Sequence, residues 1–471
     1  MEKTGTGAGN VEIKPSIISI GIVDENNNFV SGLSKQFVNL PKEQKYVDGA
    51  VIKHIGVLSQ KLKCKVKFNK SGSHKFKVKL VQNNNINVVY TNSEKNRNPN
   101  FKYQEQELEF TTDGNGEKII ESNNLFVSPA GGDKFKLFAK DEAGKVVQSG
   151  EIQNERMMYF VEVRMTGLTT CANSLDVFKN EYTKHGITFQ GLPRVSMTYM
   201  ENIGASDENI FRNNVQTAYN ASQGVHRRPY CIAIVYTGHL AVKDANKTIL
   251  KRRVSVGGAT PINIAIQDAS KRYALWNNIV TGEDWFVECY FQSVEGNRIR
   301  IPKSRCTPVQ APRYPVGYFN SVNINVRGLS AGTGTIVLKV NWVNRMRGGL
   351  SFTGTNIIAI CTKAWWQTET TQQQNEVIVH EIGHQFEMVP NPNSIYHRRK
   401  LLDKGICHYE NSKGHTGDHC HAGIPAGQTR YDSSTDKSLS RCVMYGATNG
   451  RSDFCSDCAK AIKKMDLSNG V

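Results

Sequence analysis

Long apolar runs are missing from this chain of 471 residues. Its longest ones are short stretches such as residues 231–236, whereas a membrane-spanning helix requires roughly 20 apolar residues. The first ten residues also lack the apolar segment of a secretory signal peptide. At 39% hydrophobic residues, the composition is that of an ordinary globular protein of two or three domains. We therefore expect a protein without a membrane span that is cytoplasmic at synthesis.

Acidic residues are scarce in two parts of the chain. Residues 51–100 hold eleven Lys and Arg against one acid, and residues 301–350 hold seven against none. These two windows account for the whole formal net charge of +17. A cationic surface attracts nucleic acid, anionic glycans or membranes, although a solvated face that maintains solubility is the simpler explanation. An anionic surface or a delivery machinery is thus the expected partner of the basic N-terminal part.

Helix-period patterns are absent from residues 1–155. Lys alternates with apolar residues over residues 63–80 on both sides of a Ser-Gly turn, which predicts a β-hairpin with one cationic face. Shorter alternating runs follow at residues 106–110 and 134–139. The pattern predicts an all-β module, an immunoglobulin-like sandwich.

From about residue 156 the pattern becomes mixed. A strand, a capped helix and a second strand follow one another, which predicts a β-α-β unit. These segments are residues 158–165, residues 175–185 behind the cap residues Asn173 and Ser174, and residues 187–190. Residues 240–330 show no clear pattern and are interpreted as a large insertion. The prediction is an α+β protein with two domains, residues 1–155 and 156–471.

The most helical segment covers residues 371–388, where Thr371 and Gln374 are expected to form a capping box. This segment contains His380-Glu381-Ile382-Gly383-His384, an H-E-x-x-H motif. Positions four apart share one face of a helix, so both imidazoles can reach one metal ion. Glu381 projects beside that ion and can accept a proton from water, whose pKa zinc lowers to about 7. The motif predicts a zinc hydrolase.

A catalytic zinc also needs a third protein ligand. The compact metzincin spacing would place it at residue 390, which is a proline, and Glu387 occupies the glycine position of that pattern. The stretch that follows offers no clear glutamate on a second helix. The histidines further along the chain remain as candidates, namely His397, His408, His415, His419 and His421.

The order of the motifs in the last hundred residues resembles the archaemetzincin family of zinc peptidases. The H-E-x-x-H motif is followed by His419-Cys420, then by Cys442-Val443-Met444, and then by Cys455-Ser456-Asp457-Cys458. The resemblance covers about residues 376–460. It departs from the family by a long insertion before His419 and by a shorter interval between Cys442 and Cys455.

This resemblance implies a metzincin-like metallopeptidase domain with two zinc ions. The implied ligands of the catalytic zinc are His380, His384 and His419, with Glu381 as the general base. The implied ligands of a structural zinc are Cys420, Cys442, Cys455 and Cys458, in a Cys-rich C-terminal subdomain. Met444 would then form the Met-turn beneath the catalytic metal.

Eleven cysteines occur, and their chemistry favours metal in the C-terminal cluster. A C-x-x-C pair is a common half-site for tetrahedral zinc. Five cysteines compete there for four places, and Cys407 is the one left out, with a disulfide between Cys407 and Cys420 as the alternative in an oxidising compartment. The widely spaced cysteines are interpreted as small buried hydrophobes: Cys64, Cys171, Cys231, Cys289, Cys306 and Cys361.

Three further residues and one segment are secondary candidates. Tyr445 follows Met444, and the resemblance to metzincins makes it a candidate for assisting the transition state. Trp365 and Trp366 are expected in the core or the wall of a cleft. The strand expected over residues 356–362 could be the edge strand that aligns an extended peptide by backbone pairing.

The leading hypothesis is a zinc-dependent metalloendopeptidase that acts on a protein or peptide through a Glu-activated water. It could be a bacterial effector or toxin exported by a leaderless, type VI-like route. One alternative is a non-catalytic, zinc-stabilised protein that docks on nucleic acid or a cell-wall polymer. Another is an endopeptidase for peptidoglycan cross-links.

Overall fold

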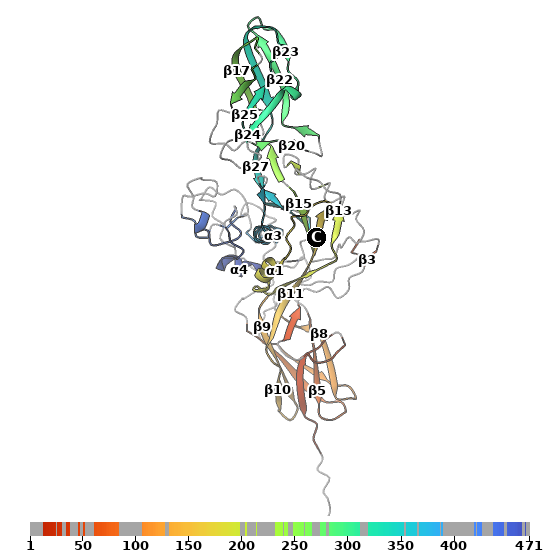
Figure 1. Ribbon diagram of the computed structural model, residues 1–471. Helices are drawn as coiled ribbons and strands as arrows, with labels where there is room; N and C mark the ends of the chain where they lie inside the picture. The colour runs from red at the N-terminus through yellow and green to blue at the C-terminus, as the bar shows by residue number, and fades with distance from the viewer. Residues whose placement is uncertain are drawn as a thin grey trace, which may run out of the picture.

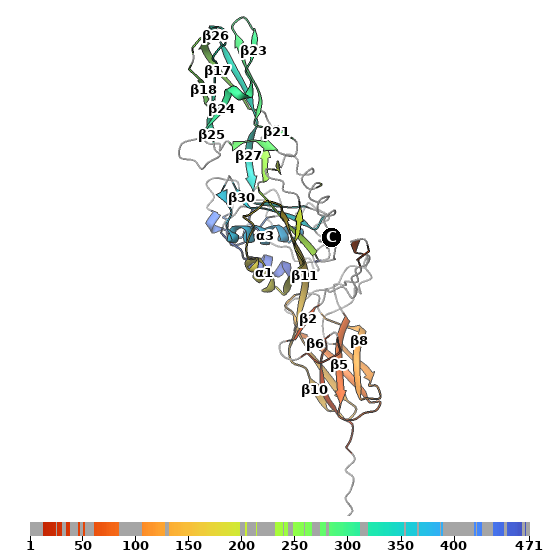
Figure 2. The same ribbon diagram turned by 45° about the vertical axis from the view of Figure 1, so that its right-hand side comes forward.

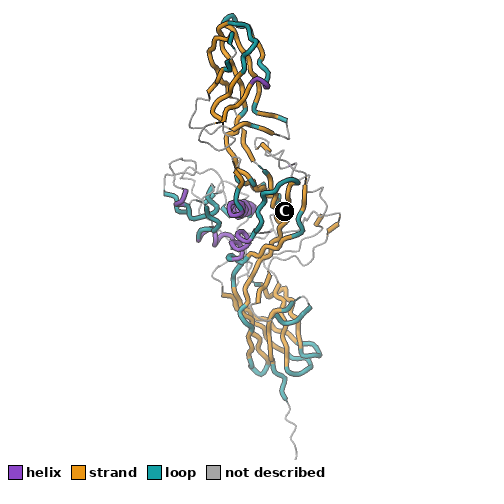
Figure 3. The backbone as a smooth tube through the Cα atoms, viewed as in Figure 1, coloured by secondary structure: helices purple, strands orange, loops and turns teal. Residues whose placement is uncertain are grey.

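The computed structural model shows an elongated molecule in which an N-terminal module, a central domain and an insert domain follow one another (Figures 1 and 2). Strands occur in all three regions, and most of the helical residues that the structure describes lie in the central domain (Figure 3). None of the helices described is long and apolar enough to cross a membrane. The structure describes residues 13–24, 26–30, 34–37, 46–47, 50–51, 61–83, 106–127, 131–197, 203–204, 213, 231–238, 240–243, 248–258, 260–265, 274–278, 282–310, 319–352, 355–364, 367–386, 388–389, 419–420, 422–425, 437–446, 450–463 and 467.

The N-terminal module is β-rich, as predicted, and its strands enclose one apolar core. One sheet has the order β1-β5-β8, formed by β1 (Ile17–Ile22), β5 (Lys61–Phe68) and β8 (Glu117–Phe126). The strands that face it are β2 (Ser34–Phe37), β6 (Lys75–Asn83), β7 (Gln106–Thr111), β9 (Lys134–Asp141) and β10 (Val146–Gln148), while β3 (Tyr46–Val47) and β4 (Ala50–Val51) pair separately. Alternate residues such as Val66 and Val78 are fully buried between the two groups. The more specific prediction of an immunoglobulin-like sandwich stays a prediction.

The hairpin predicted over residues 63–80 is wrong in its pairing. Both strands exist, but β5 pairs with β1 and β8, whereas β6 pairs with β7 and β9. Each strand buries its apolar side chains in the same core from an opposite sheet. Alternation along the sequence sets which face is buried, and it carries no information about which strand lies alongside. The lysines therefore form two separate cationic faces.

One of these faces brings lysines together across β6 and β9. Lys77 is directly opposite Lys140 in the antiparallel register, and Lys75 and Lys136 are exposed on the same side of the sheet. Like charges directly opposite in a sheet repel each other. Lys77 also pairs with Glu107 at 3.3 Å, so part of this charge is neutralised.

A single long strand, β11 (Ile152–Met165), belongs to both the N-terminal module and the central domain. Its first residues pair with β2 and β9, and its later residues pair in parallel with β12 (Ile187–Gly191), β13 (Val195–Met197) and β15 (Cys231–Thr237). The sheet continues through β29 (Ile357–Cys361), parallel to β15, to β28 (Gly349–Ser351), which is antiparallel. The domain boundary predicted after residue 155 therefore falls inside a strand.

Two helices cover one face of the central sheet. They are α1 (Asp176–Thr183) and α3 (Thr371–Gln385), and their apolar side chains share a core with β11 and β15. The hydroxyl of Tyr182 on α1 donates to the carbonyl of Val379 on α3 at 2.9 Å, which fixes the two helices together. The cap of α1 is Leu175 rather than Asn173 or Ser174, although the amide of Asp176 donates to the hydroxyl of Ser174. Short elements complete the domain: β30 (Lys363–Ala364), β31 (Gln367–Thr368), η6 (Lys437–Leu439) and α4 (Ser456–Ile462).

The segment interpreted as an irregular insertion folds largely into strands. Its insert domain has one sheet of β17 (Thr248–Val256), β26 (Gly332–Val340), β22 (Phe286–Ser293) and β23 (Arg298–Arg300), and a second sheet of β18 (Ile262–Ala265), β25 (Phe319–Ile324) and β24 (Cys306–Gln310), which follows η3 (Lys303–Arg305). The connection to the central domain contains β14 (Ile203–Gly204), β16 (Leu240–Lys243), β19 (Ala274–Leu275), β20 (Asn277–Asn278), β21 (Glu283–Asp284) and β27 (Trp342–Arg347). The two sheets enclose a core of their own, so this segment is a separately packed unit.

Candidate metal centre

Helix α3 carries the H-E-x-x-H motif, and its cap lies one residue earlier than predicted. Thr370 is the N-cap: its hydroxyl accepts from the amide of Gln373 at 3.2 Å, and the Gln373 side chain accepts from the amide of Thr370 at 2.8 Å. Gln374, expected in the capping box, instead accepts from the amide of Ala172 at 2.8 Å. The predicted box is therefore shifted by one residue, because the side chain of Gln374 holds the segment before α1.

Three histidines converge at the C-terminal half of this helix. His380 and His384 lie one turn apart, and their Nε2 atoms are 3.0 Å from each other. His419 joins them from a distant part of the sequence, and one nitrogen from each ring lies within 4.8 Å of the others. Three nitrogens bound to one tetrahedral zinc would be about 3.4 Å apart, from the usual Zn–N distance. This three-histidine set is thus compatible with a single metal ion.

The ring of His380 is oriented by a backbone carbonyl. Its Nδ1–H donates to the carbonyl oxygen of Val443 at 2.7 Å, which leaves Nε2 to face the other two rings. Such a bond fixes the tautomer of a metal-binding imidazole and raises its basicity. Nothing in the sequence pointed to Val443 in this role beyond its place between Cys442 and Met444.

Met444 lies directly against the helix between the two histidines. It sits in a tight turn, in which the amide of Tyr445 donates to the carbonyl of Cys442 at 3.1 Å. A β-carbon on Gly383 would be 2.4 Å from the sulfur of Met444 and 3.0 Å from its methyl carbon. Glycine at this position therefore lets the Met444 side chain pack directly against the helix, and a larger residue would require that side chain to shift. Tyr445 itself is buried, with 1% of its surface exposed.

Glu381 is directed toward strand β28. It is buried, with 7% of its surface exposed, and a β-carbon on Gly349 would be 3.0 Å from its Cγ atom. The same β-carbon would be 2.5 Å from Val377 on α3. The absence of a side chain at Gly349 therefore lets the strand approach the helix closely at the level of Glu381.

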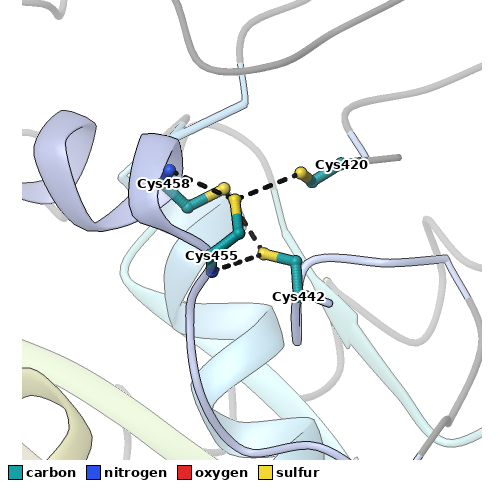
Figure 4. Close-up of side chains that lie close together, drawn as sticks. All are labelled: Cys420, Cys442, Cys455 and Cys458. Carbon is teal, nitrogen blue, oxygen red and sulfur yellow. Dashed lines mark hydrogen bonds between the residues drawn. The ribbon is translucent and has the colours of Figure 1, made fainter. Parts of the chain in front are cut away.

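Four cysteines converge at a second point, namely Cys420, Cys442, Cys455 and Cys458 (Figure 4). The sulfur of Cys420 is 3.7 Å from that of Cys455, and the sulfur of Cys442 is 3.5 Å from that of Cys458. A disulfide has an S–S distance of about 2.05 Å, whereas two thiolates on one tetrahedral zinc are about 3.8 Å apart. This four-cysteine set has the geometry and the chemistry of a structural metal site.

The electrostatics of the four-cysteine set agree with this interpretation. The neighbouring thiols of Cys420 and then Cys455 raise the pKa of the Cys442 thiol far above its ordinary value, although Cys458 opposes them. Crowded, buried thiolates repel one another, so all four can ionise together only if a cation compensates their charge. Backbone amides assist: Cys455 N–H donates to the sulfur of Cys442, and Cys458 N–H donates to the sulfur of Cys455.

The two sets are connected through short backbone links. Cys420 follows His419, and its amide donates to the carbonyl of Met444 at 2.9 Å. The carboxylate of Glu181 on α1 accepts from the amide of Phe454 at 2.9 Å, just before the C-x-x-C pair. Sequence reasoning did not identify Glu181, whose only signal is a charged residue on the apolar side of an amphipathic helix. Because Cys420 directly follows His419, a cation bound to the four sulfurs would also position His419.

Several predicted residues lie outside the described part of the chain. These are the alternative ligands His397, His408, His415 and His421, together with Cys407, Trp365 and Trp366. The prediction of an edge strand over residues 356–362 is wrong, because β29 lies between β15 and β28 and is therefore interior. Among the strands described, β28 is the last one on that side of the sheet.

Comparisons with known proteins add no family. No family model and no curated protein matches the chain. Among solved structures, a protein assigned as a polysaccharide deacetylase from Bacillus anthracis matches at 10% identity and a TM-score of 0.12. A polysaccharide deacetylase from Bacillus cereus matches at 10% identity and a TM-score of 0.13. Both matches cover 37% of this chain and 55% of the other protein, so the chain spans about half the length of these structures.

Proposed function

We propose that this protein is a zinc-dependent metallopeptidase of metzincin type. The observation that carries the proposal is the convergence of His380, His384 and His419 around one point, with Glu381 on the same helix as the first two. The turn that places Met444 under Gly383 supports it further. Three converging imidazoles, with a carboxylate next to the first of them on the same helix, are the residue set that metal-assisted hydrolysis requires.

Each side chain has a distinct role in this reaction. Zinc held by the three-histidine set would supply a Lewis acid that polarises the scissile carbonyl and acidifies water. Glu381 would accept a proton from the attacking water and deliver it to the leaving amine nitrogen. Val443 holds the ring of His380 in its binding tautomer.

Strand β28 is suited to align an extended substrate. The amide of Cys361 donates to the carbonyl of Gly348, and the amide of Phe352 donates to the carbonyl of Ile357. Because hydrogen bonding alternates along an antiparallel pair, the backbone groups of Gly349 and Ser351 point to the other side. None of the described strands pairs with that side. A peptide added there would form backbone hydrogen bonds with β28, the strand against which the Glu381 side chain packs at Gly349.

Replacement of Glu381 by Gln tests the proposal. We expect metal content to stay unchanged while hydrolysis falls by about 1,000-fold or more, because the proton acceptor is lost and the histidines remain. The assay compares an unfolded protein substrate with cross-linked peptidoglycan, which separates the two substrate classes. Unchanged hydrolysis in the Glu381→Gln protein would refute the assignment.

A second candidate function is docking on an anionic polymer. The observation in its favour is the lysine face of the N-terminal module, where Lys77 and Lys140 are held directly opposite each other. Repulsion between them would be relieved by a bound polyanion. Metal analysis separates a pure binder from the peptidase: loss of one of two metals in His380→Ala supports the peptidase, and an unchanged metal content supports the binder.

A further inference from the structure

Two cysteines on different strands of the insert domain lie in the same apolar core. Cys289 lies on β22 and Cys306 is the first residue of β24, so they belong to the two different sheets of this domain. Both side chains enter the same core, where Cys289 is fully buried and Cys306 is 6% exposed. The two residues thus enter the same interior from the two different sheets of this unit.

Hydrogen bonds link both cysteines to the same pair of neighbouring residues, Ile301 and Pro302. The amide of Ile301 donates to the carbonyl of Cys289 at 2.8 Å. The thiol of Cys306 donates to the carbonyl of the next residue, Pro302, at 3.8 Å. The short helix η3 ends just before Cys306, and its Arg305 amide donates back to Pro302 at 3.0 Å. These links bring the Cys306 side chain back toward β22.

Inside this core each of the two thiols changes the acidity of the other. The contact with Cys306 raises the pKa of the Cys289 thiol, and the contact with Cys289 lowers the pKa of the Cys306 thiol. Cys306 is therefore the sulfur that ionises more readily, and it is also the more accessible one. Cys64 offers a contrast in the N-terminal module, where burial alone raises its pKa to about 12.

We propose that Cys289 and Cys306 form a disulfide that joins the two sheets of the insert domain when the protein meets a disulfide oxidant. The thiolate of Cys306 attacks the oxidant's S–S bond and releases one thiol, which leaves a mixed disulfide on Cys306. The thiolate of Cys289 then attacks the sulfur of Cys306 and releases the second thiol. Two protons and two electrons leave the cysteines, and the oxidant is reduced to two thiols.

The redox state of this pair would depend on the cellular compartment. In a reducing cytoplasm it stays as two thiols, whereas in an oxidising compartment it closes. The insert domain lies at the opposite end of the molecule from the N-terminal module and away from helix α3 (Figure 1). Closure would therefore stabilise a remote domain without altering the three-histidine set.

Peptide mapping of the full-length protein tests the proposal. The protein is treated with oxidised glutathione, denatured with a chelator and N-ethylmaleimide, and digested with trypsin. Basic residues such as Arg298 and Arg305 separate the two cysteines, so they fall on different peptides. We expect these peptides to be linked, with a mass about 2 Da below their sum, and to separate on reduction. Recovery of both cysteines as maleimide adducts would overturn the proposal.

Two variants act as controls. Cys306→Ser should abolish the linked peptide and leave Cys289 alkylated, whereas the matched variant Cys64→Ser should retain the link. If Cys306→Ser does not fold, the wild-type map still decides. Oxidation should also raise the melting temperature of the wild-type protein by a few degrees. Hydrolysis should be equal in the oxidised and reduced proteins, because the insert domain lies away from α3. The peptide map itself needs no activity, so its outcome is independent of the peptidase assignment.

Discussion

The Met444 sulfur occupies the space that a side chain at Gly383 would need, since a β-carbon on the glycine would lie 2.4 Å from it. We expect Gly383→Ala to displace either the Met444 turn or the helix between His380 and His384. A displacement of about 1 Å at a catalytic site can cost about 100-fold in rate, and we expect a loss of kcat/KM of that order. Steady-state kinetics and metal analysis of the purified variant measure the effect.

The control for this change is Gly332→Ala, at a position in the insert domain where nothing lies within 4 Å of the added carbon. Its activity should equal that of the wild type. The double variant Gly383→Ala with Met444→Ala removes the clash and should recover part of the lost kcat/KM. Full activity in Gly383→Ala alone would contradict this packing.

Metal removal should proceed in two steps. The imidazoles of the three-histidine set are partly exposed, whereas three of the four cysteines in the four-cysteine set are buried. A chelator should therefore remove the histidine-bound metal first and abolish hydrolysis, while the cysteine-bound metal is released only when the C-terminal subdomain opens. Elemental analysis and circular dichroism along a chelator titration follow both steps. Simultaneous release of both metals would contradict this order of release.

Glu181 should make the stability of the C-terminal subdomain sensitive to acid. Burial raises its pKa, but hydrogen bonds from His185, Lys184 and the amide of Phe454 outweigh this, so the net pKa is lowered from 4.5. A lowered pKa means that the carboxylate stabilises the folded state above about pH 4.5, and that this contribution is lost as the pH falls through the folded value. Glu181→Gln should cost about 1–3 kcal/mol at pH 7.

Urea unfolding at several pH values checks this prediction. The difference in unfolding free energy between wild type and Glu181→Gln should shrink as the pH falls below 4.5. Glu151→Gln is the matched control, because its exposed carboxylate pairs with Lys134 at the surface and should contribute nothing measurable. An equal effect of the two variants would argue against the role assigned to Glu181.

The lysine face of the N-terminal module should determine binding to polyanions. We expect the triple variant of Lys75, Lys77 and Lys140 to Glu to elute earlier from immobilised heparin and to have a weaker salt dependence of binding. Insert-domain cations provide the control, since Lys251, Arg253 and Arg300 are exposed but lie on strands separated by β26 and β22. A larger effect from the control triple would place the docking surface on the insert domain instead.

The helix and its motif were predictable because local chemistry determines them. Residues four apart share a helix face whatever surrounds them, so His380 and His384 could be paired from spacing alone. The cap was displaced by one residue to Thr370, because Gln374 bonds to a segment two hundred residues earlier in the chain. Tertiary contacts of that kind leave no periodic signal in the sequence.

Long-range relationships were harder to predict. His419 was named through the order of motifs, whereas spacing alone left five histidines open, since the cost of closing a loop grows only slowly with its length. The pairing of β5 and β6 was wrong, because alternation reveals a buried face and not a neighbour. Cys289 and Cys306 were interpreted separately, since only the packing of two sheets brings them together.

Strand β11 makes the N-terminal module and the central domain a single mechanical body. A pulling force on the module would be carried along this strand into its parallel ladder with β15, where it acts in shear and loads several hydrogen bonds at once. Gly131 adds a second attachment, because its amide donates to the carbonyl of Lys463 beyond α4. Tension or torque applied to the module would therefore be transmitted to the helix-bearing sheet through β11 and through this second attachment.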